Sequence, residues 1–209
     1  MHDTAYKHCS LFFENYLQHI PFDLNVIEVG SQDVNGSLKD IFNRPNIKYT
    51  GLDFVSGKNV DMLLIDPYKL PLADNSVDVL VTSSCLEHCD MFWVLYLDML
   101  RVLKPHGLLY INVPSNRGVF HRYPVDCWRF MPDAGKALEK WGSISGYTDC
   151  TMLESFVGNM GADEWQDFVT VILKDKQYTS FYRDRITASI NEFENGLKGE
   201  SSELINFKY

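Results

Sequence analysis

The chain has 209 residues, 45% of them apolar, which is enough to build the core of one α/β domain. Its formal charge of −9 opposes sequence-independent nucleic-acid binding, which needs a basic surface. No apolar run approaches the ~18 residues of a membrane span. Residues 1–13 lack the basic start and long apolar stretch of a signal peptide, so a cytoplasmic protein is expected.

The predicted elements alternate between helix and strand along the chain. Leu11, Phe12 and Leu17 recur at helical spacing before Pro21, which predicts an N-terminal helix within residues 1–20. Short apolar or alternating runs predict strands at residues 25–30, 47–53, 60–65, 77–83, 108–114 and 167–174. Further helices are predicted at residues 91–103, 132–141 and 180–197. This alternation indicates a Rossmann-like, mostly parallel α/β sheet with helices on both faces.

The predicted elements suggest one domain and one extension. Residues 1–175 are expected to form the domain, and residues 176–209 a helical extension. The 180–197 helix is amphipathic, so we expect it to pack on the domain or to meet a partner chain.

One connection is too short for a helical crossover between parallel strands. Only six residues separate Asp53 from Val60. Either this connection is a bare loop, or the strand at residues 60–65 is short and marginal.

Five cysteines in a chain expected to be cytoplasmic argue against a disulfide framework. Cys85, His88 and Cys89 fall within five residues, but a closed zinc site needs four convergent ligands, and no second pair stands out. We therefore predict buried small residues here and no metal.

The strongest functional signal lies at the ends of the predicted strands. Glu28 and Gly30 end the first, and Gln32 stands where a G-x-G-x-x-G fingerprint has its second glycine for a pyrophosphate. Asp53 ends the second strand, where an acid accepts hydrogen bonds from ribose hydroxyls. Asp66 follows the third strand and can read an adenine edge. This pattern favours a cofactor with adenine and ribose but no pyrophosphate, and acidic residues favour a positively charged one.

Four motifs follow one another in an order typical of a known family. They are VIEVGSQDVNGS at 26–37, YTGLDF at 49–54, LPLADNSVDVLVTSSCLEHC at 70–89 and RVLKPHG at 101–107. Together they resemble the class I S-adenosylmethionine-dependent methyltransferases, most closely the small methyltransferases of glycan and surface-polysaccharide biosynthesis. The resemblance covers about residues 25–140. It implies a seven-stranded sheet with an antiparallel last strand, and residues 150–174 would supply the final two strands.

The resemblance implies S-adenosyl-L-methionine as the cofactor. Glu28 and Gly30 would shape the turn against its methionine part, and Asp53 would hold its ribose. The implied cofactor residues are Glu28, Gly30, Ser31, Gly36, Asp53, Phe54, Asp66, Pro67, Cys85 and Leu86. The chain departs from the family pattern in three ways: Gln32 replaces the second glycine, His106 replaces the usual glycine of KPHG, and the second crossover is abbreviated.

The run FHRYPVDCWRF at residues 120–130 follows the fifth strand, where the ligand crevice of an open α/β sheet lies. A sugar hydroxyl is a poor acid, and it benefits from a base as its proton leaves. His121 is the predicted base, and Asp126 is predicted to orient it or to act as the base itself.

Three more residues of this run are predicted to bind the acceptor. Arg122 and Arg129 suit an anionic group such as a phosphate, and Tyr123 offers a flat wall for a sugar. The resembling methyltransferases carry a similar H-x-Y-P-x-D-x-x-R-F run here. The alternative for Arg129 is a structural ion pair with Asp126, and Trp128 is expected to anchor the loop.

Glu87 and His88 are expected to help start the 91–103 helix rather than to do chemistry. No acidic cluster accompanies His121 in the sequence, so dependence on a divalent metal is not predicted.

The predicted function is O-methylation of a sugar, a nucleotide-linked sugar or a phosphorylated small molecule in polysaccharide biosynthesis. Two alternatives stay open: a non-catalytic methyltransferase-like module that binds a partner, and a methyltransferase acting on protein, RNA or another small metabolite. Gln32 and Val34 argue against a nicotinamide-dependent oxidoreductase. Dimers are common among such enzymes, which makes the 180–197 helix a candidate contact for a homodimer.

Overall fold

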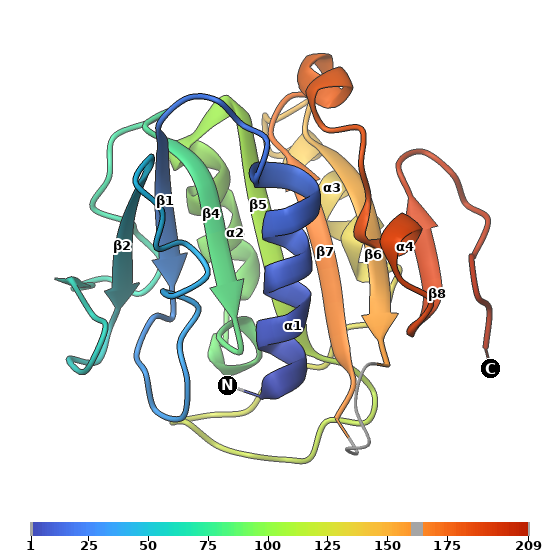
Figure 1. Ribbon diagram of the computed structural model, residues 1–209. Coiled ribbons are helices and arrows are strands. Elements are labelled where there is room, and N and C mark those ends of the chain that lie inside the picture. Colours follow the sequence, from blue (N-terminus) through green and yellow to red (C-terminus); the bar gives the residue numbers. More distant parts are fainter. Residues whose placement is uncertain (1, 160–164, 209) are drawn as a thin grey trace.

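The computed structural model describes residues 2–159 and 165–208, and the strands of this part form one sheet (Figure 1). The strands are β1 (Leu24–Val29), β2 (Ile47–Asp53), β3 (Met62–Leu63), β4 (Val77–Ser83), β5 (Leu103–Pro114), β6 (Thr151–Gly158), β7 (Asp167–Leu173) and β8 (Phe193–Lys198). The longer helices are α1 (Asp3–Phe12), which continues into a π-helical turn (Phe13–Leu17), α2 (Phe92–Val102) and α3 (Ala134–Ile144). Shorter helical pieces are two 3₁₀ turns (Leu86–His88 and Lys176–Phe181) and α4 (Ile186–Ser189). Within the described ranges, no helix has the length and apolar character needed to cross a membrane.

The sheet has the strand order β3-β2-β1-β4-β5-β7-β6-β8. The first five strands along the chain are parallel to one another, whereas β7 is antiparallel to both of its neighbours, β5 and β6. In Figure 1, α1 covers one face of the sheet, and α2 and α3 cover the other. The predicted Rossmann-like α/β class is therefore confirmed, with eight strands in place of seven. Because β1, β2, β4 and β5 are parallel, their carboxyl ends meet at one edge.

Most predicted strands agree with the structure to within a residue or two. Residues 150–174 supply β6 and β7, as the resemblance implied. Of the two options for residues 60–65, the short strand is observed, because β3 has only two residues and both are exposed. The strand predicted at 108–114 begins earlier, at Leu103, directly after α2.

Each face of the sheet has its own apolar core. Tyr96 of α2 is fully buried on one face, and Phe12 of α1 on the other. Between β1 and β2, residues 30–46 form turns rather than a helix. Leu38 and Phe42 of this segment are buried beside Phe12, so turns with apolar side chains cover the sheet where a crossover helix is usual.

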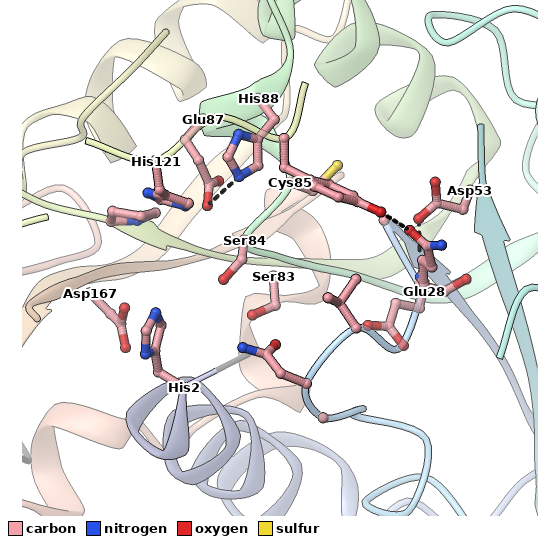
Figure 2. A pocket seen from close by; sticks show the side chains of 18 of the residues that line it. His2, Glu28, Asp53, Ser83, Ser84, Cys85, Glu87, His88, His121 and Asp167 are labelled. Carbon is pink, nitrogen blue, oxygen red and sulfur yellow. Dashed lines mark hydrogen bonds and ion pairs between the residues drawn. The ribbon is translucent and has the colours of Figure 1, made fainter. Parts of the chain in front are cut away.

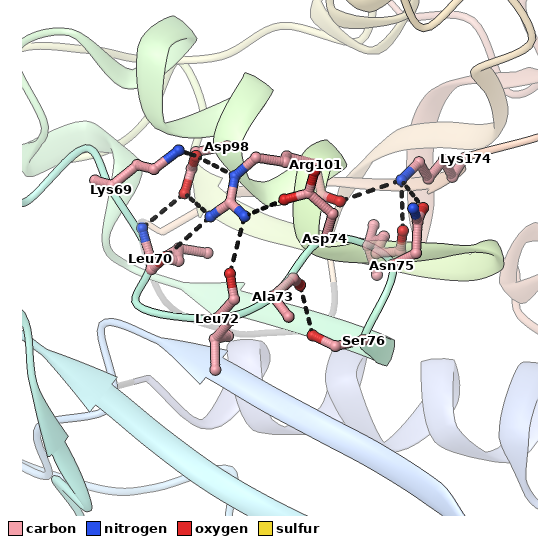
Figure 3. A network of polar contacts seen from close by, with 11 residues as sticks. Lys69, Leu70, Leu72, Ala73, Asp74, Asn75, Ser76, Asp98, Arg101 and Lys174 are labelled. Carbon is pink, nitrogen blue, oxygen red and sulfur yellow. Dashed lines mark hydrogen bonds and ion pairs between the residues drawn. The ribbon is translucent and has the colours of Figure 1, made fainter.

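A polar network on α2 holds the segment between β3 and β4, which also contains no helix (Figure 3). Arg101 donates to both carboxylate oxygens of Asp98, at 2.7 and 3.0 Å. It also donates to the carbonyls of Leu72 and Leu70, at 2.8 and 2.9 Å. Asp98 accepts the Leu70 N–H at 2.6 Å. One Arg–Asp pair thus satisfies several backbone groups that a helix would have paired internally.

The prediction of an amphipathic helix at residues 180–197 is wrong. This stretch contains α4 and most of β8, and β8 pairs antiparallel with β6. Asn195 has φ of +52° and precedes Gly196, a dipeptide that favours a turn over a helix. The outer edge of β6 offers backbone hydrogen bonds that a strand can use and a helix cannot. The long helix expected to pack on the domain or to meet a partner chain is therefore not formed.

Glu154 connects the two ends of the chain to β6. It is fully buried, accepts the Tyr16 hydroxyl at 2.7 Å, and accepts the N–H groups of Ile186 and Thr187 at 2.8 and 3.0 Å. The Thr187 hydroxyl also donates to it, at 2.7 Å. Four donors on one carboxylate explain how a buried charge is accommodated here.

Candidate functional site

A pocket of about 330 Å³ lies at the carboxyl ends of the parallel strands (Figure 2). Ten of the residues predicted from the sequence line it: Glu28, Gly30, Ser31, Gly36, Asp53, Phe54, Cys85, His121, Arg122 and Tyr123. They come from the ends of β1, β2 and β4 and from the loop after β5. The parallel sheet brings these distant segments together because all four strands end at the same edge.

Gly30 lets the ends of β1 and β4 approach each other. Its φ is +84°, a conformation that residues with a side chain rarely adopt. A Cβ atom at this position would lie 2.6 Å from Cβ of Cys85 and 2.8 Å from its sulfur. Both the backbone conformation and the close approach therefore require glycine at this turn.

Asp53 holds the turn after β1 against the end of β2. Its carboxylate accepts the N–H groups of Gln32 and Val55, each at 3.0 Å. The side chain is buried and lines the pocket. Each oxygen accepts one hydrogen bond and keeps further acceptor capacity, which suits a ligand with neighbouring hydroxyl groups.

Glu28 adds a second acidic group to the pocket. Its pKa is raised to about 7, mainly by burial and to a smaller extent by the charges of Asp53 and Asp33, against the lowering effect of a hydrogen bond from the Tyr49 hydroxyl. The nearby acids favour a ligand that carries positive charge.

Three of the predicted cofactor residues lie outside the pocket. Asp66 is exposed and accepts the N–H of Tyr68 at 2.8 Å, and Pro67 beside it is also exposed. Leu86 is fully buried in the core below the pocket. Asp66 and Pro67 follow the two-residue strand β3, and no residue of the segment after β3 lines the pocket.

In the loop after β5, Arg122 and Tyr123 have the most accessible side chains facing the pocket. Tyr123 donates from its hydroxyl to the Gln32 amide oxygen at 3.0 Å, which joins this loop to the turn after β1. Arg122 is exposed, and no acidic side chain of residues 2–159 and 165–208 pairs with it. Its guanidinium is therefore available to an anionic ligand.

Asp126 and Arg129 are paired with each other. The Asp126 side chain is 1% exposed, and Arg129 donates to its two oxygens at 2.5 and 2.8 Å. The same carboxylate accepts the backbone N–H of His121 at 2.7 Å. The hydrogen bond from Arg129 lowers the pKa of Asp126 to about 2. This arrangement corresponds to the structural ion pair rather than to a free base and a free anion clamp.

The aromatic residues of the same run anchor it. Trp128 donates from Nε1 to the carbonyl of Cys89 at 2.9 Å, and its ring packs edge-to-face with Phe92. Phe130 is buried and stacks on Phe168. These contacts hold the loop against α2 and β7.

Glu87 and His88 belong to the pocket, a placement that the sequence reasoning missed. They lie in the 3₁₀ turn after β4, and α2 begins only at Phe92. Glu87 is fully buried. Ligand atoms of Glu87, His88 and His121 lie within 4.8 Å of one another, so one buried acid stands beside His121 in addition to the predicted Asp126. The two loops that carry them meet only in the folded sheet.

Trp165 and Asp167 also line the pocket and were not predicted. Asp167 is the first residue of β7. Because β7 is antiparallel, its amino end lies at the edge where the parallel strands have their carboxyl ends. The sequence feature that could have identified Asp167 as a pocket residue was therefore an acidic residue at the start, rather than at the end, of a predicted strand.

Comparison with known proteins agrees with this architecture. Residues 36–111 match a family model described as a methyltransferase domain. An uncharacterized methyltransferase of Mycobacterium bovis is 49% identical over 68 residues, which are 32% of this chain and 27% of that protein. The chain thus spans about a quarter of the length of this curated relative.

Two solved structures share the fold. One is a Burkholderia thailandensis 1,6-didemethyltoxoflavin-N1-methyltransferase with bound 1,6-didemethyltoxoflavin and S-adenosylhomocysteine; it is 15% identical, with a TM-score of 0.63 over 83% of this chain and 80% of that one. The other is an S-adenosylmethionine-dependent methyltransferase of Aquifex aeolicus, 15% identical, with a TM-score of 0.51 over 83% of this chain and all of that one. The sheet, the pocket at its carboxyl edge and the domain match lead to one conclusion: this chain carries a methyltransferase domain with the class I, Rossmann-like fold.

Proposed function

We propose that this protein transfers a methyl group from S-adenosylmethionine to a hydroxyl group of a polar small molecule. The observation that carries the proposal is a single pocket with two chemically different sides. One side has Asp53 and Glu28 at the ends of neighbouring strands, and the other has His121 and Arg122 on the loop after β5.

The acidic side suits the cofactor. S-adenosylmethionine carries a sulfonium and an ammonium group, and the buried acids of the pocket favour such positive charge. Asp53 has acceptor capacity left for the two ribose hydroxyls. The turn at Gly30 would lie against the methionine part. The S-adenosylhomocysteine bound to the Burkholderia thailandensis protein, which shares this fold, supports the same cofactor here.

The loop side suits a hydroxylated acceptor with an anionic group. Arg122 has no acidic partner in the described chain and can bind a phosphate. Tyr123 is half exposed at the pocket and offers a flat surface to a sugar ring. We therefore propose a sugar, a nucleotide-linked sugar or a phosphorylated small molecule as the acceptor, in polysaccharide biosynthesis in the cytoplasm.

The reaction is an in-line displacement. An acceptor oxygen attacks the methyl carbon, the carbon–sulfur bond breaks, and its electron pair stays on sulfur, leaving S-adenosylhomocysteine. The hydroxyl proton must leave during this step, which requires a group beside the acceptor that makes the hydroxyl more acidic or takes its proton. We assign this task to His121, which lines the pocket on the loop after β5.

The cofactor proposal is tested by thermal unfolding with S-adenosylhomocysteine, which should raise the unfolding temperature of the wild-type protein. Asp53→Asn should weaken this shift, because one of its two acceptor oxygens becomes a donor. Asp66→Asn is the matched control: it is exposed and outside the pocket, so its shift should equal that of the wild type. A wild-type protein that gives no shift would rule out the proposal.

The acceptor proposal is tested by methyl transfer from labelled S-adenosylmethionine to sugar phosphates and nucleotide sugars, with RNA and protein as competing acceptor classes. His121→Ala should keep the thermal shift and lose turnover. Transfer to RNA or protein alone would refute the proposed acceptor, and cofactor binding without transfer to any acceptor would favour a non-catalytic module.

A further inference from the structure

Glu87, His88 and His121 bring three metal-binding groups to one point of the pocket (Figure 2). Glu87 and His88 lie in the 3₁₀ turn after β4, and His121 lies in the loop after β5. Their ligand atoms are all within 4.8 Å of one another, and Oε1 of Glu87 is 3.8 Å from Nε2 of His88. Two strand ends thus supply one carboxylate and two imidazoles.

Both imidazoles are held in the orientation that metal binding needs. Nδ1 of His88 lies 2.5 Å from the carbonyl oxygen of Val125, and Nδ1 of His121 lies 2.9 Å from that of Val119. A carbonyl oxygen only accepts, so each Nδ1 carries the proton, and each Nε2 keeps a free lone pair. Metal-binding histidines are usually fixed by this kind of hydrogen bond to the backbone.

The Glu87 carboxylate has no partner that explains its burial. It is fully buried, and neither of its oxygens has a hydrogen-bond partner among residues 2–159 and 165–208. Glu154, by contrast, is equally buried but accepts four hydrogen bonds. A buried carboxyl group without a donor is costly, and a bound ion or water is one way in which native proteins satisfy such a group. Burial raises the pKa of Glu87 to about 8, and a bound cation would reverse this by stabilising the anion.

We propose that Glu87, His88 and His121 bind one divalent transition-metal ion beside the methyl acceptor. Two imidazoles and one carboxylate on one side of an ion are the donor set of open transition-metal sites, whereas Mg²⁺ and Ca²⁺ prefer oxygen ligands. Ligand atoms about 2.1 Å from an ion are roughly 3 to 3.5 Å apart. The observed spacings, 3.8 Å between Glu87 and His88 and up to 4.8 Å within the group, are wider than this, so the three side chains draw closer when an ion binds.

This inference rests on the proposed function and gives the metal a task in it. The acceptor hydroxyl binds at an open coordination position, where the ion lowers its pKa. Its proton leaves to a water molecule, the resulting alkoxide attacks the methyl carbon, and the carbon–sulfur bond breaks as before. His121 is then a metal ligand rather than the general base predicted from the sequence.

Metal binding can be measured on the full chain without any reaction. We expect metal-stripped protein to bind one Mn²⁺ per chain, seen as loss of the free-ion signal in electron paramagnetic resonance. Glu87→Gln and His121→Gln should each weaken this binding by at least about tenfold. His19→Gln is the matched control, since His19 is exposed and lies outside this pocket. With Co²⁺, the absorption spectrum should show no thiolate charge-transfer band, which excludes binding by Cys85 or Cys89.

The outcomes separate this inference from the proposed function. If the wild-type protein bound no Mn²⁺, or if Glu87→Gln bound it as tightly as the wild type, the metal site would be refuted. Thermal unfolding with S-adenosylhomocysteine is measured on the same samples. A normal shift in a protein without metal binding would leave the proposed function standing, whereas loss of the shift in the wild type would refute that function independently. His121 lies on an exposed loop, so its variant remains informative if Glu87→Gln fails to fold.

Discussion

Glu28 shows how one buried side chain connects the pocket to the stability of the fold. Its carboxyl group has an ordinary pKa of 4.5, which burial raises to about 7. Between these values the folded chain holds a proton that the unfolded chain has lost. The contribution of Glu28 to stability is therefore complete below about pH 4.5 and is lost as the pH rises through 7.

Replacing Glu28 by Gln should flatten the pH dependence of stability. Between pH 4 and pH 8, Glu28 alone should lower the wild-type free energy of unfolding by up to roughly 3 kcal/mol. This figure follows from the raised pKa, because one pKa unit corresponds to about 1.4 kcal/mol. Glu28→Gln lacks this contribution. Urea unfolding of both proteins from pH 4 to 8 measures the difference, and parallel profiles would contradict the raised pKa.

The identities of Gly30 and Asp53 are explained by the groups that surround each of them in the pocket. Gly30 is needed because Cys85 occupies the space of a side chain, and Asp53 is needed because two backbone N–H groups point at it. Sequence reasoning identified both residues from their places at strand ends. Their exact partners come from different strands, so they could only be seen in the fold.

At the scale of elements, the connections between the first four strands contain no helix. Buried apolar side chains take the place of a helix between β1 and β2, and a polar network does so between β3 and β4. Arg101 and Asp98 on α2 satisfy the backbone of the segment before β4 (Figure 3). This explains why a chain with short crossovers still forms a regular parallel sheet.

Arg101→Met should destabilise the protein by about 2 to 3 kcal/mol. It leaves Asp98, whose side chain is only 9% exposed, with Lys69 as its remaining cationic partner. It also leaves the carbonyls of Leu70 and Leu72 without their donor. Asp74→Asn is the control: Asp74 pairs with the same arginine but is 69% exposed, so the cost should stay below about 0.5 kcal/mol. Equal destabilisation by the two variants, in chemical unfolding, would contradict this account.

At the scale of the whole molecule, Glu154 joins the beginning and the end of the described chain. Tyr16 follows α1, and Ile186 and Thr187 begin α4, yet all three donate to this one carboxylate on β6. The final strand β8 pairs with the same β6. The C-terminal segment is therefore part of the sheet and not a separate helix.

Glu154→Gln should lower the free energy of unfolding by about 2 to 3 kcal/mol, because its amide nitrogen would face buried donors. It should also speed proteolytic cleavage after β7. Tyr16→Phe is the matched control, since it removes a single hydrogen bond and should cost about 1 kcal/mol. If Glu154→Gln were cleaved no faster than Tyr16→Phe, the carboxylate would not be what holds the C-terminal segment.

The sequence alone determined the order and kind of most elements, because the spacing of apolar residues is a local property. It also determined that Glu28, Asp53, Cys85 and His121 would meet, since parallel strands end at one edge. The C-terminal strand was missed because its partner, the edge of β6, is distant in sequence.

Only the tertiary structure decided the chemical state of the residues predicted for the site and of those beside them. It paired Asp126 with Arg129, left Asp66 in solvent, and buried Glu87 without a donor beside two imidazoles. Burial, hydrogen-bond partners and pKa depend on segments far apart in the chain. The sequence therefore identified many of the residues that reach the pocket, whereas the packing of the loops brought in Glu87 and Asp167 and decided which side chains are free to bind a ligand.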